Sequence, residues 1–453
     1  MMPPISPVTI TGAGPTGALL AIFLRRRGIP VTLYERRADP RTRPPETGRS
    51  INLAMADRGI HALKLAGVYP HIRDEMIPMR GRMIHDLTGS TTLQPYGQRP
   101  NEVIYSISRN RLNNLLLDVA TKRFGAEVLF EHELRDVDLE KGLARIHDLS
   151  RNRGFDAPAA PLLAAEGAGS AARNRLAAAR RIAVRIEPLE HAYKELTIPA
   201  GANNSHVMAR EALHIWPRGN FMLIALPNVD GTFTATLFLQ RDRFDELRDP
   251  AGIEKFFDES FPDAARLMPR LISEFQLNPT GALATVYSRP WSHRGTVLLM
   301  GDAAHGIVPF HGQGMNCCFE DCVEFDALID HHASWEPLFE TFERVRKPDT
   351  DAIAAMAIEN YLEMRERVAD ERFQLQKLLS LELEKRNPER FIPRYSMVSF
   401  HHEIGYATAA ARGAIQQEIL DGLTQRVRSI GQIDYERAAR EIKARLTPIG
   451  APA

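Results

Sequence analysis

The feature that most constrains the fold is a glycine-rich turn close to the start of the chain. A short apolar segment, 8–11, leads into Gly12-Ala13-Gly14-Pro15-Thr16-Gly17, after which apolar residues recur with helical spacing. Gly28 ends this expected helix, and a second apolar segment, 31–34, is followed directly by Glu35. The order of strand, glycine-rich turn, helix, strand and acid predicts a dinucleotide-binding βαβ unit.

Each glycine of such a turn has a physical reason. Gly12 permits the tight turn, Gly14 lets the backbone approach a pyrophosphate, and Gly17 lets the helix pack closely on the strand. The pyrophosphate is expected at the helix N-terminus, where free N–H groups and the helix dipole favour an anion. Glu35 can accept hydrogen bonds from the adenosine ribose. This unit alone does not distinguish FAD from NAD.

A second motif, far along the chain, makes FAD the predicted ligand. Residues 296–302 read as a buried strand that ends in Gly301-Asp302, and a glycine-rich segment, Pro309-Phe310-His311-Gly312-Gln313-Gly314-Met315-Asn316, follows. An acid at the end of a strand can bind the ribityl chain of a flavin. A glycine-rich turn that opens a helix can present N–H groups to the flavin ring. An NAD dehydrogenase has no use for this arrangement.

The pattern of apolar residues changes between and after these motifs. Short alternating segments within 81–100 and 181–279 are typical of a half-exposed antiparallel sheet. We therefore predict an α/β (α+β) fold. A Rossmann-like FAD-binding domain (1–80, 101–180 and 280–330) is interleaved with an antiparallel-sheet substrate domain (81–100 and 181–279), and a helical region (331–453) follows. Residues 150–163 are a poor strand, and the helical region is interrupted around 387–398.

Composition and charge exclude several classes of protein. Lys and Arg together number 57, as do Asp and Glu, so no nucleic acid or anionic membrane is expected as a partner. We find no signal peptide and no run of about 18 uncharged apolar residues. Cys317, Cys318 and Cys322 lie in one segment, which favours buried thiols in a reducing cytoplasm over a disulfide framework or a zinc site. We therefore expect a cytoplasmic protein without a metal. For the oligomeric state we expect a monomer or a homodimer.

These motifs also carry a resemblance to a known class. Gly301-Asp302-Ala303-Ala304-His305 with the segment 309–316, and Arg109 within Ser106-Ile107-Ser108-Arg109, resemble the FAD motifs of the single-component aromatic hydroxylases of the para-hydroxybenzoate hydroxylase type. Further strings are similar to the soluble bacterial kynurenine 3-monooxygenases, and the resemblance spans about residues 8–445. They are the segments 48–54, 79–83, 93–97, 193–196, 212–217, 359–361 and 390–398.

The resemblance implies a set of residues for the cofactor and the substrate. The expected cofactor-binding residues are Gly12, Gly14, Gly17, Glu35, Arg36, Ala54, Arg109, Asp302, Gly314, Met315 and Asn316. The amino-acid end of the substrate is expected at Arg82, Tyr96, Asn360 and Tyr395, and its ring and the flavin at Phe238, Pro309, Phe310 and His311. A guanidinium can hold a carboxylate in bidentate fashion, while tyrosine hydroxyls and an amide can complete the site.

The implied activity is the hydroxylation of L-kynurenine at C3 to 3-hydroxy-L-kynurenine. NADPH binds transiently and reduces the FAD, O₂ then gives a C4a-hydroperoxyflavin, and the aromatic ring attacks its distal oxygen. The arylamine already makes the ring carbon electron-rich, so we predict no catalytic base or nucleophile. The protein is expected to position the substrate and exclude water. Segment 387–398 is a candidate for coupling flavin reduction to substrate binding.

One segment departs from the family pattern. Where the family has Gly-Ala-Asp-Gly, this chain reads Ala164-Ala165-Glu166-Gly167, which adds a methyl group and a methylene near the expected cofactor. FAD affinity or NADPH use could suffer. Two alternatives therefore stay open: a hydroxylase of a kynurenine-like compound in secondary metabolism, and an FAD-binding protein with impaired turnover. A flavin halogenase would need a lysine and a W-x-W-x-I string that we do not find.

Overall fold

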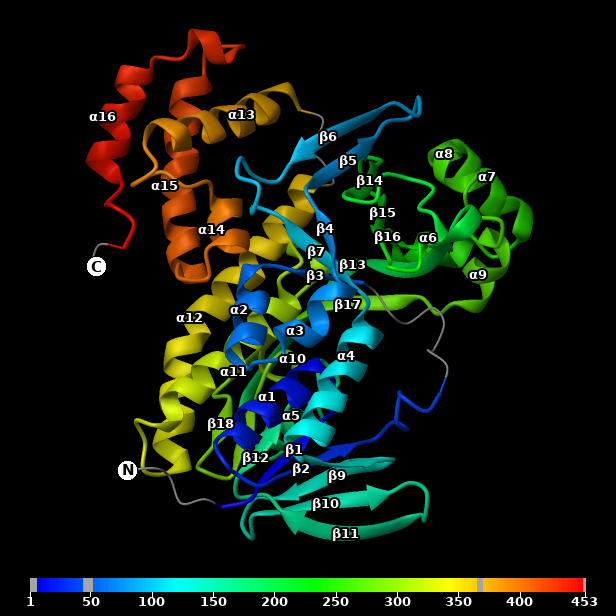
Figure 1. Ribbon diagram of the computed structural model, residues 1–453, viewed down its shortest axis with the longest axis vertical. Helices are drawn as coiled ribbons and strands as arrows, with labels where there is room; N and C mark the ends of the chain where they lie inside the picture. Colours follow the sequence, from blue (N-terminus) through cyan, green and yellow to red (C-terminus); the bar gives the residue numbers. More distant parts are fainter. Residues whose placement is uncertain (1–5, 44–51, 365–369, 451–453) are drawn as a thin grey trace.

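The computed structural model describes residues 6–43, 52–364 and 370–450 of the chain (Figure 1). One part is a six-stranded sheet in the order β18-β19-β12-β1-β2-β8, in which only the edge strand β18 is antiparallel to its neighbour. Helix α1 (Pro15–Arg26) starts directly after the glycine turn and buries most of its length. The strands are β1 (Val8–Thr11), β2 (Val31–Glu35), β8 (Glu127–Phe130), β12 (Leu162–Ala164), β18 (Ser292–His293) and β19 (Val297–Leu299).

The second large sheet has seven strands in the order β17-β13-β16-β15-β14-β5-β6. Its neighbours are antiparallel as expected, except that β14 runs parallel to β5. Because β17 pairs with β13, this sheet also extends beyond the range 181–279 that we predicted for it. The strands are β5 (Gly81–His85), β6 (Thr91–Pro95), β13 (Ala183–Ile198), β14 (Leu213–Pro217), β15 (Met222–Pro227), β16 (Phe233–Gln240) and β17 (Gly281–Arg289).

The two faces of this second sheet pack against different partners, as strand alternation requires. Leu237 and Leu239 of β16 face a hydrophobic core shared with short helices on the outer side. Phe238, between them, faces the opposite core together with Phe310 and Tyr361. The seven-stranded sheet therefore has an outer helical cover and an inner face that meets the rest of the chain. The covering helices are α6 (Arg241–Glu246), α7 (Pro250–Ser260), α8 (Pro262–Ala265) and α9 (Leu271–Leu277).

Two three-stranded sheets complete the β structure. One joins β3 (Leu53–Met55), β7 (Ile104–Ile107) and β4 (Ile77–Met79), and the other is the meander β9 (His132–Asp138), β10 (Leu143–Asp148) and β11 (Arg153–Pro158). Our interpretation of 150–163 as a poor strand was wrong. The exposed strand β11 is held by its backbone pairing with β10, and the short, fully buried strand β12 lies between β1 and β19.

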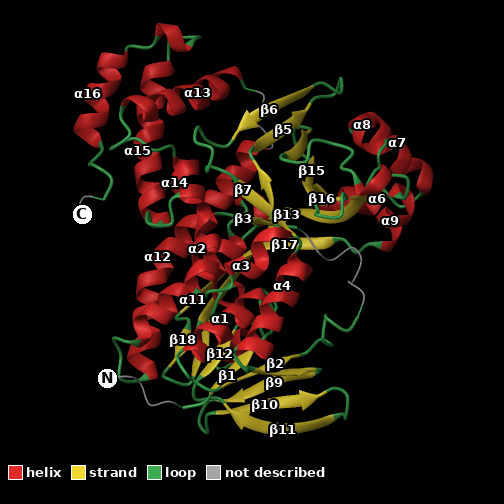
Figure 2. Cartoon of the chain, in the orientation of Figure 1, coloured by secondary structure: helices red, strands yellow, loops and turns green. Residues whose placement is uncertain are grey.

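Helices dominate the second half of the chain (Figure 2). Helix α12 runs along the six-stranded sheet and leads to α13–α16, which lie at the end of the molecule where β5 and β6 are found (Figure 1). The expected interruption around 387–398 is present, because α13 ends at Arg386 and α14 begins at Arg394. The helices are α10 (Asp302–His305), α11 (Gly314–Ile329), α12 (Trp335–Leu362), α13 (Glu371–Arg386), α14 (Arg394–Phe400), α15 (Tyr406–Thr424) and α16 (Tyr435–Arg445).

Helices of the N-terminal half contribute to the core of the six-stranded sheet. Residues 57–76, which we expected to be helical, divide into α2 (Asp57–Leu65), α3 (Tyr69–Ile72) and a short 3₁₀ turn. The helix expected from Arg109 is α4 (Arg109–Asp118), and α5 (Ala171–Ala178) follows β12. None of the helices in the described ranges has the length and apolarity needed to cross a bilayer. Part of one string behind the resemblance, 48–51, lies outside the described residues.

Candidate active site

The glycine turn after β1 has the geometry of a dinucleotide site. Gly12 has a φ of +91°, and a Cβ there would lie 2.4 Å from the carbonyl oxygen of Ala165. A Cβ at Gly17 would lie 1.9 Å from the carbonyl oxygen of Gly12. A Cβ at Gly14, in contrast, would meet no protein atom within 4 Å, because Gly14 borders a cavity at the start of α1. Gly12 and Gly17 are therefore packed against protein backbone, whereas Gly14 leaves space where a pyrophosphate would lie.

This first cavity lies at the carboxyl ends of β1, β2 and β12 and measures about 120 Å³. Glu35 anchors its rim, because Oε2 accepts a hydrogen bond from Ala13 N and Oε1 accepts one from Arg37 N, both at 2.9 Å. A carboxylate has lone pairs to spare after two such bonds, so Glu35 can still accept from ribose hydroxyls. Predicted cofactor residues that border this cavity are Gly12, Gly14, Glu35, Arg36, Arg109 and Asp302.

A second cavity of about 250 Å³ adjoins the first, and we call it the ring cavity. Arg109 and Asp302 border both cavities, so one elongated ligand can reach from Glu35 past Asp302 into the ring cavity. At its far side lie Gly314 and Met315, the first residues of α11, whose N-terminus has no side-chain cap. Free N–H groups and the positive end of a helix suit the part of a flavin that becomes negative on reduction. The residues present therefore fit FAD.

Asn316 borders neither cavity, although we had expected it to bind the cofactor. It is fully buried, and its Nδ2 donates to the carbonyl oxygens of Ala54 at 2.8 Å and Gly312 at 2.9 Å. Its Oδ1 accepts a hydrogen bond from Ala56 N at 2.9 Å. Asn316 thus ties β3 to the turn before α11, and we call this arrangement the Asn316 clasp. Its effect on a bound flavin would be indirect, through the positions of Ala54 and Gly312, which both border the ring cavity.

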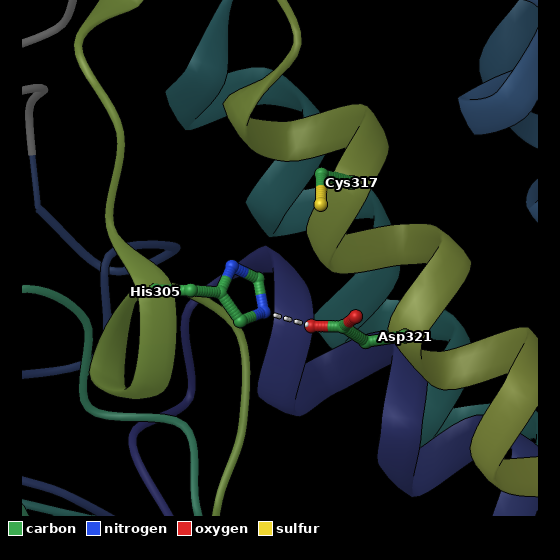
Figure 3. A group of neighbouring side chains, drawn as sticks. All are labelled: His305, Cys317 and Asp321. Atoms are coloured by element: carbon green, nitrogen blue, oxygen red, sulfur yellow. Dashed lines mark hydrogen bonds and ion pairs between the residues drawn. The ribbon is translucent and has the colours of Figure 1, made fainter. Parts of the chain in front are cut away.

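A buried carboxylate, which the sequence did not single out, anchors the turn that carries Asp302. Asp321 Oδ2 lies 2.6 Å from His305 Nε2, an approach visible in Figure 3, and accepts a hydrogen bond from Gly301 N at 3.2 Å. Arg346 Nε donates to the other oxygen at 2.9 Å. Burial by itself would raise the pKa of Asp321, but His305 and Arg346 hold it below its ordinary value. The anchor keeps Gly301, with a φ of +58°, in the conformation that directs Asp302 toward the cavities.

His305, Cys317 and Asp321 also lie close enough together to suggest a metal site (Figure 3). The guanidinium of Arg346 occupies this neighbourhood, because its Nη2 lies 3.6 Å from Cys317 Sγ while Nε binds Asp321. Burial also raises the pKa of the Cys317 thiol well above its ordinary value, which disfavours the thiolate that a metal would bind. We therefore interpret this group as the structural anchor described above.

The segment that departs from the family pattern is accommodated without blocking the first cavity. Ala164 is fully buried in β12. Glu166 borders the cavity, but its Oε2 is directed to the start of α5, where it accepts hydrogen bonds from Ser170 Oγ at 2.6 Å and Ala172 N at 3.0 Å. Burial raises the pKa of Glu166. The longer side chain therefore binds the N-terminal turn of α5, and its influence on FAD or NADPH stays a prediction.

The ring cavity has apolar and aromatic walls. The rings of Phe238 on β16 and Phe310 in the turn η4 (Pro309–His311) lie 5.0 Å apart, and Phe310 lies 4.4 Å from Tyr361 of α12. The inner face of the seven-stranded sheet supplies Leu213, Met222 and Ile224. A flat aromatic ring fits such a surface.

Four side chains separate the ring cavity from a third cavity of about 160 Å³, which lies among α12–α15 and which we call the helical cavity. These four, Arg82, Tyr96, His311 and Tyr395, border both cavities, and we call them the partition. Tyr395 stacks on Tyr96 with ring centroids 5.4 Å apart and on His311 at 5.3 Å. The guanidinium carbon of Arg82 lies 5.8 Å from the ring of Tyr96 and 5.3 Å from that of Tyr395. The fold thus brings together three of the four residues predicted for the amino-acid end.

The partition carries one strong positive charge. Arg82 is 7% exposed, and among the described residues the carboxylate oxygen that pairs with it, Glu363 Oε1, lies 3.9 Å away, beyond hydrogen-bond distance. Burial lowers the pKa of His311 to about 3, so its imidazole is neutral near pH 7. Burial also raises the pKa values of Tyr96 and Tyr395, which keeps both hydroxyls protonated and able to donate. An anionic group from a ligand would meet a buried guanidinium flanked by two phenols.

Asn360, the fourth residue predicted for the amino-acid end, borders only the helical cavity. Its Nδ2 donates to the carbonyl oxygen of Phe310 at 2.6 Å, so it fixes the turn that forms one wall of the ring cavity. Glu363 and Lys377 also border the helical cavity, and we had selected neither. Nothing in the sequence distinguishes them from other charged residues on helices, since their role depends on elements distant in the chain.

Comparisons with known proteins agree with this geometry. The FAD binding domain family matches residues 6–353. A relative from Myxococcus xanthus, named kynurenine 3-monooxygenase, is 45% identical over 444 residues, which cover 97% of this chain and 96% of the relative. A relative of the same name from Xanthomonas oryzae pv. oryzae is 45% identical over 453 residues, 99% of each chain. The chain belongs to the kynurenine 3-monooxygenase family. The resemblance that we inferred from the motifs is thus confirmed.

Solved structures support the fold of this kynurenine 3-monooxygenase family member. A tetrameric 2-methyl-3-hydroxypyridine-5-carboxylic acid oxygenase has a TM-score of 0.64 at 18% identity, and the match covers 84% of this chain and 97% of that one. The Pseudomonas aeruginosa protein PqsL in complex with 2-aminobenzoylacetate has a TM-score of 0.63 at 18% identity, covering 80% and 96% of the two chains. The predicted fold class, with FAD as cofactor, is confirmed.

Proposed function

We propose that this chain is an FAD-dependent monooxygenase that hydroxylates L-kynurenine at C3, with NADPH and O₂ as co-substrates. The family supports this activity, and one observation in the structure carries it. An aromatic-lined cavity begins at the flavin-binding turn and ends at a buried arginine flanked by two tyrosines. An arylketone with an amino-acid tail matches this cavity, because its flat ring can lie between the aromatic walls while its carboxylate reaches the arginine.

The residues of the first cavity and of α11 would hold the FAD, which when bound supplies the reduction and oxygen activation. Gly14 leaves room for the pyrophosphate, Glu35 accepts from the ribose, and Asp302 lies where the two cavities join. The N–H groups at Gly314 and Met315 would face the flavin ring, where they could stabilise negative charge on it. None of these residues has to transfer a proton to the substrate.

The remaining residues position the substrate and exclude water. Phe238 and Phe310 flank the aromatic ring, the guanidinium of Arg82 binds the α-carboxylate, and the hydroxyls of Tyr96 and Tyr395 donate to it. The substrate's amino group already activates the ring carbon that is hydroxylated. The neutral His311 closes the ring cavity beside the flavin-binding turn, where it can exchange a hydrogen bond without adding charge.

Several finer statements belong to the same proposal. NADPH would act as a transient reductant, because we find no second glycine fingerprint in the sequence. The three cysteines are free and buried, which fits the cytoplasm as the place where the protein works. A monomer and a homodimer both suit a site that one chain builds alone.

The decisive test is the product formed from L-kynurenine, NADPH and ¹⁸O₂ by the FAD-loaded protein. We expect one labelled oxygen atom at C3 and NADPH consumption that rises when L-kynurenine is added. A yellow protein that oxidises NADPH without an oxygenated product would support the alternative of impaired turnover. Product formed only from a related arylketone would support the alternative of a different substrate in secondary metabolism.

A further inference from the structure

Lys377 is a charged side chain of the helical cavity that the proposed function does not yet use. It lies on α13, within the C-terminal helices, and borders the same cavity as Arg82, Asn360 and Glu363. Its Nζ donates to Gln94 Oε1 at 3.3 Å, and within the described ranges it has no ion pair with a carboxylate. A partly buried ammonium whose one polar contact is long and neutral has capacity for an anionic ligand.

The charges around Lys377 leave the helical cavity positive. Burial and, to a smaller extent, the nearby charge of Arg82 lower the pKa of Lys377 to about 8, against the opposing effect of Glu363. Arg394, which also borders the cavity, is paired with Glu359 by a bond of 2.6 Å from Nη1 to Oε2. Among the described residues that border the cavity, the uncompensated set is therefore two cations, Arg82 and Lys377, and one anion, Glu363. The other described titratable groups that border this cavity are Tyr96, His311 and Tyr395, all uncharged near pH 7.

A zwitterionic amino acid completes this charge pattern. Its carboxylate can lie between Arg82 and Lys377, and its ammonium can approach Glu363, which lies 3.9 Å from Arg82. We propose that Lys377 is a second cation for the substrate's α-carboxylate and that it makes the site selective for an amino acid over the corresponding amine. The inference rests on the proposed function and adds to it a residue that determines specificity.

The proposal has a consequence for pH. Lys377 is a cation whose pKa is lowered to about 8, so its charge is present below that pH and lost above it. Binding of the carboxylate should therefore weaken as pH rises through about 8. An arginine at this position would stay charged and remove that dependence.

The experiment is a binding titration of the FAD-loaded, oxidised protein without NADPH, followed by the change in flavin absorbance. The two ligands are L-kynurenine and kynuramine, the amine that lacks the α-carboxylate. The proteins are the wild type, Lys377→Met, Lys377→Arg and a matched control, Lys385→Met, which removes an exposed lysine of the same helix. We expect Lys377→Met to weaken L-kynurenine binding about tenfold or more and to change kynuramine binding less than about twofold.

Lys377→Arg should bind L-kynurenine as tightly as the wild type below about pH 8 and should not show the weaker binding expected of the wild type above that pH. Lys385→Met should match the wild type. Equal weakening of both ligands by Lys377→Met would show a general loss of cavity structure and overturn the proposal, as would unchanged affinity for both. The proposed function is judged separately on wild-type product. If the wild type hydroxylates L-kynurenine while Lys377→Met keeps its selectivity, only the role of Lys377 is refuted.

Discussion

The Asn316 clasp gives a prediction that separates a structural role from direct contact with the cofactor. Asn316→Ala removes three hydrogen bonds at once, to the carbonyl oxygens of Ala54 and Gly312 and from Ala56 N. These backbone groups lie in the buried interior between β3 and α11, and each unsatisfied group costs about 1–3 kcal/mol. Because the segments can relax and the terms overlap, we expect a loss of about 2–4 kcal/mol in the free energy of unfolding.

The measurement compares urea unfolding of the wild type and Asn316→Ala, each with saturating FAD and after FAD removal. A ligand that binds only the folded state adds more stability the more tightly it binds. Unfolding with and without FAD therefore distinguishes a structural role of Asn316 from direct contact with the cofactor. The clasp predicts that most of the loss persists without FAD, because the lost bonds are between protein groups. Asn174→Ala, an exposed asparagine on α5, should leave both conditions unchanged. If the variant matched the wild type without FAD and differed only with FAD, Asn316 would contact the cofactor and our reasoning would be refuted.

Three further predictions follow from contacts described above. Gly17→Ala should yield a colourless protein, because its Cβ would lie 1.9 Å from the carbonyl oxygen of Gly12, and retained flavin absorbance would contradict this. Arg82→Met should raise the dissociation constant for L-kynurenine by about ten- to a hundredfold, as expected for a lost charge-assisted bond, without changing FAD content. Burial would raise the pKa of Asp263, yet contacts of 2.8 Å from His85 Nδ1 and Trp216 Nε1 hold it at about 2. Because this pKa is below its unfolded value, Asp263 should contribute stability that is lost as pH falls from about 4 to 2. An acid titration of stability in which Asp263→Asn lost as much stability as the wild type over this range would contradict the prediction.

The parts of the fold that were predictable are those coded by local patterns. Gly12, Gly14 and Gly17 have fixed spacing because a tight turn and a helix start within a few residues of each other. The strand before Gly301-Asp302 was equally clear, since a short apolar run leads to a glycine and an acid, although β19 itself ends at Leu299. Alternation in 190–240 predicted strands of the sheet for the same reason.

The parts that could not be predicted depend on partners distant in the chain. No local signal shows that β5 lies parallel to β14, or that β12 lies at the centre of a sheet although residues 150–163 are a poor strand in the sequence. Motif resemblance selected Asn316 for the cofactor and Asn360 for the substrate, but only their hydrogen bonds show that each holds backbone in place. Asp321 and Lys377 were missed because their surroundings come from other helices and strands.

The members of the partition are synthesised at different times, which affects the order in which the cofactor and substrate sites can form. Three of its members, Arg82, Tyr96 and His311, precede α11, whereas Tyr395 lies on α14. Because folding proceeds from the N-terminus as a chain is made, the glycine turn, Asp302 and α11 can be in place before Tyr395 exists. The nascent protein can therefore take up FAD while the ring cavity is still open on one side. Closure of the cavity by the C-terminal helices would come last, so that a chain cut short after α12, which supplies Arg346 to the Asp321 anchor, could bind the flavin but could not enclose the substrate.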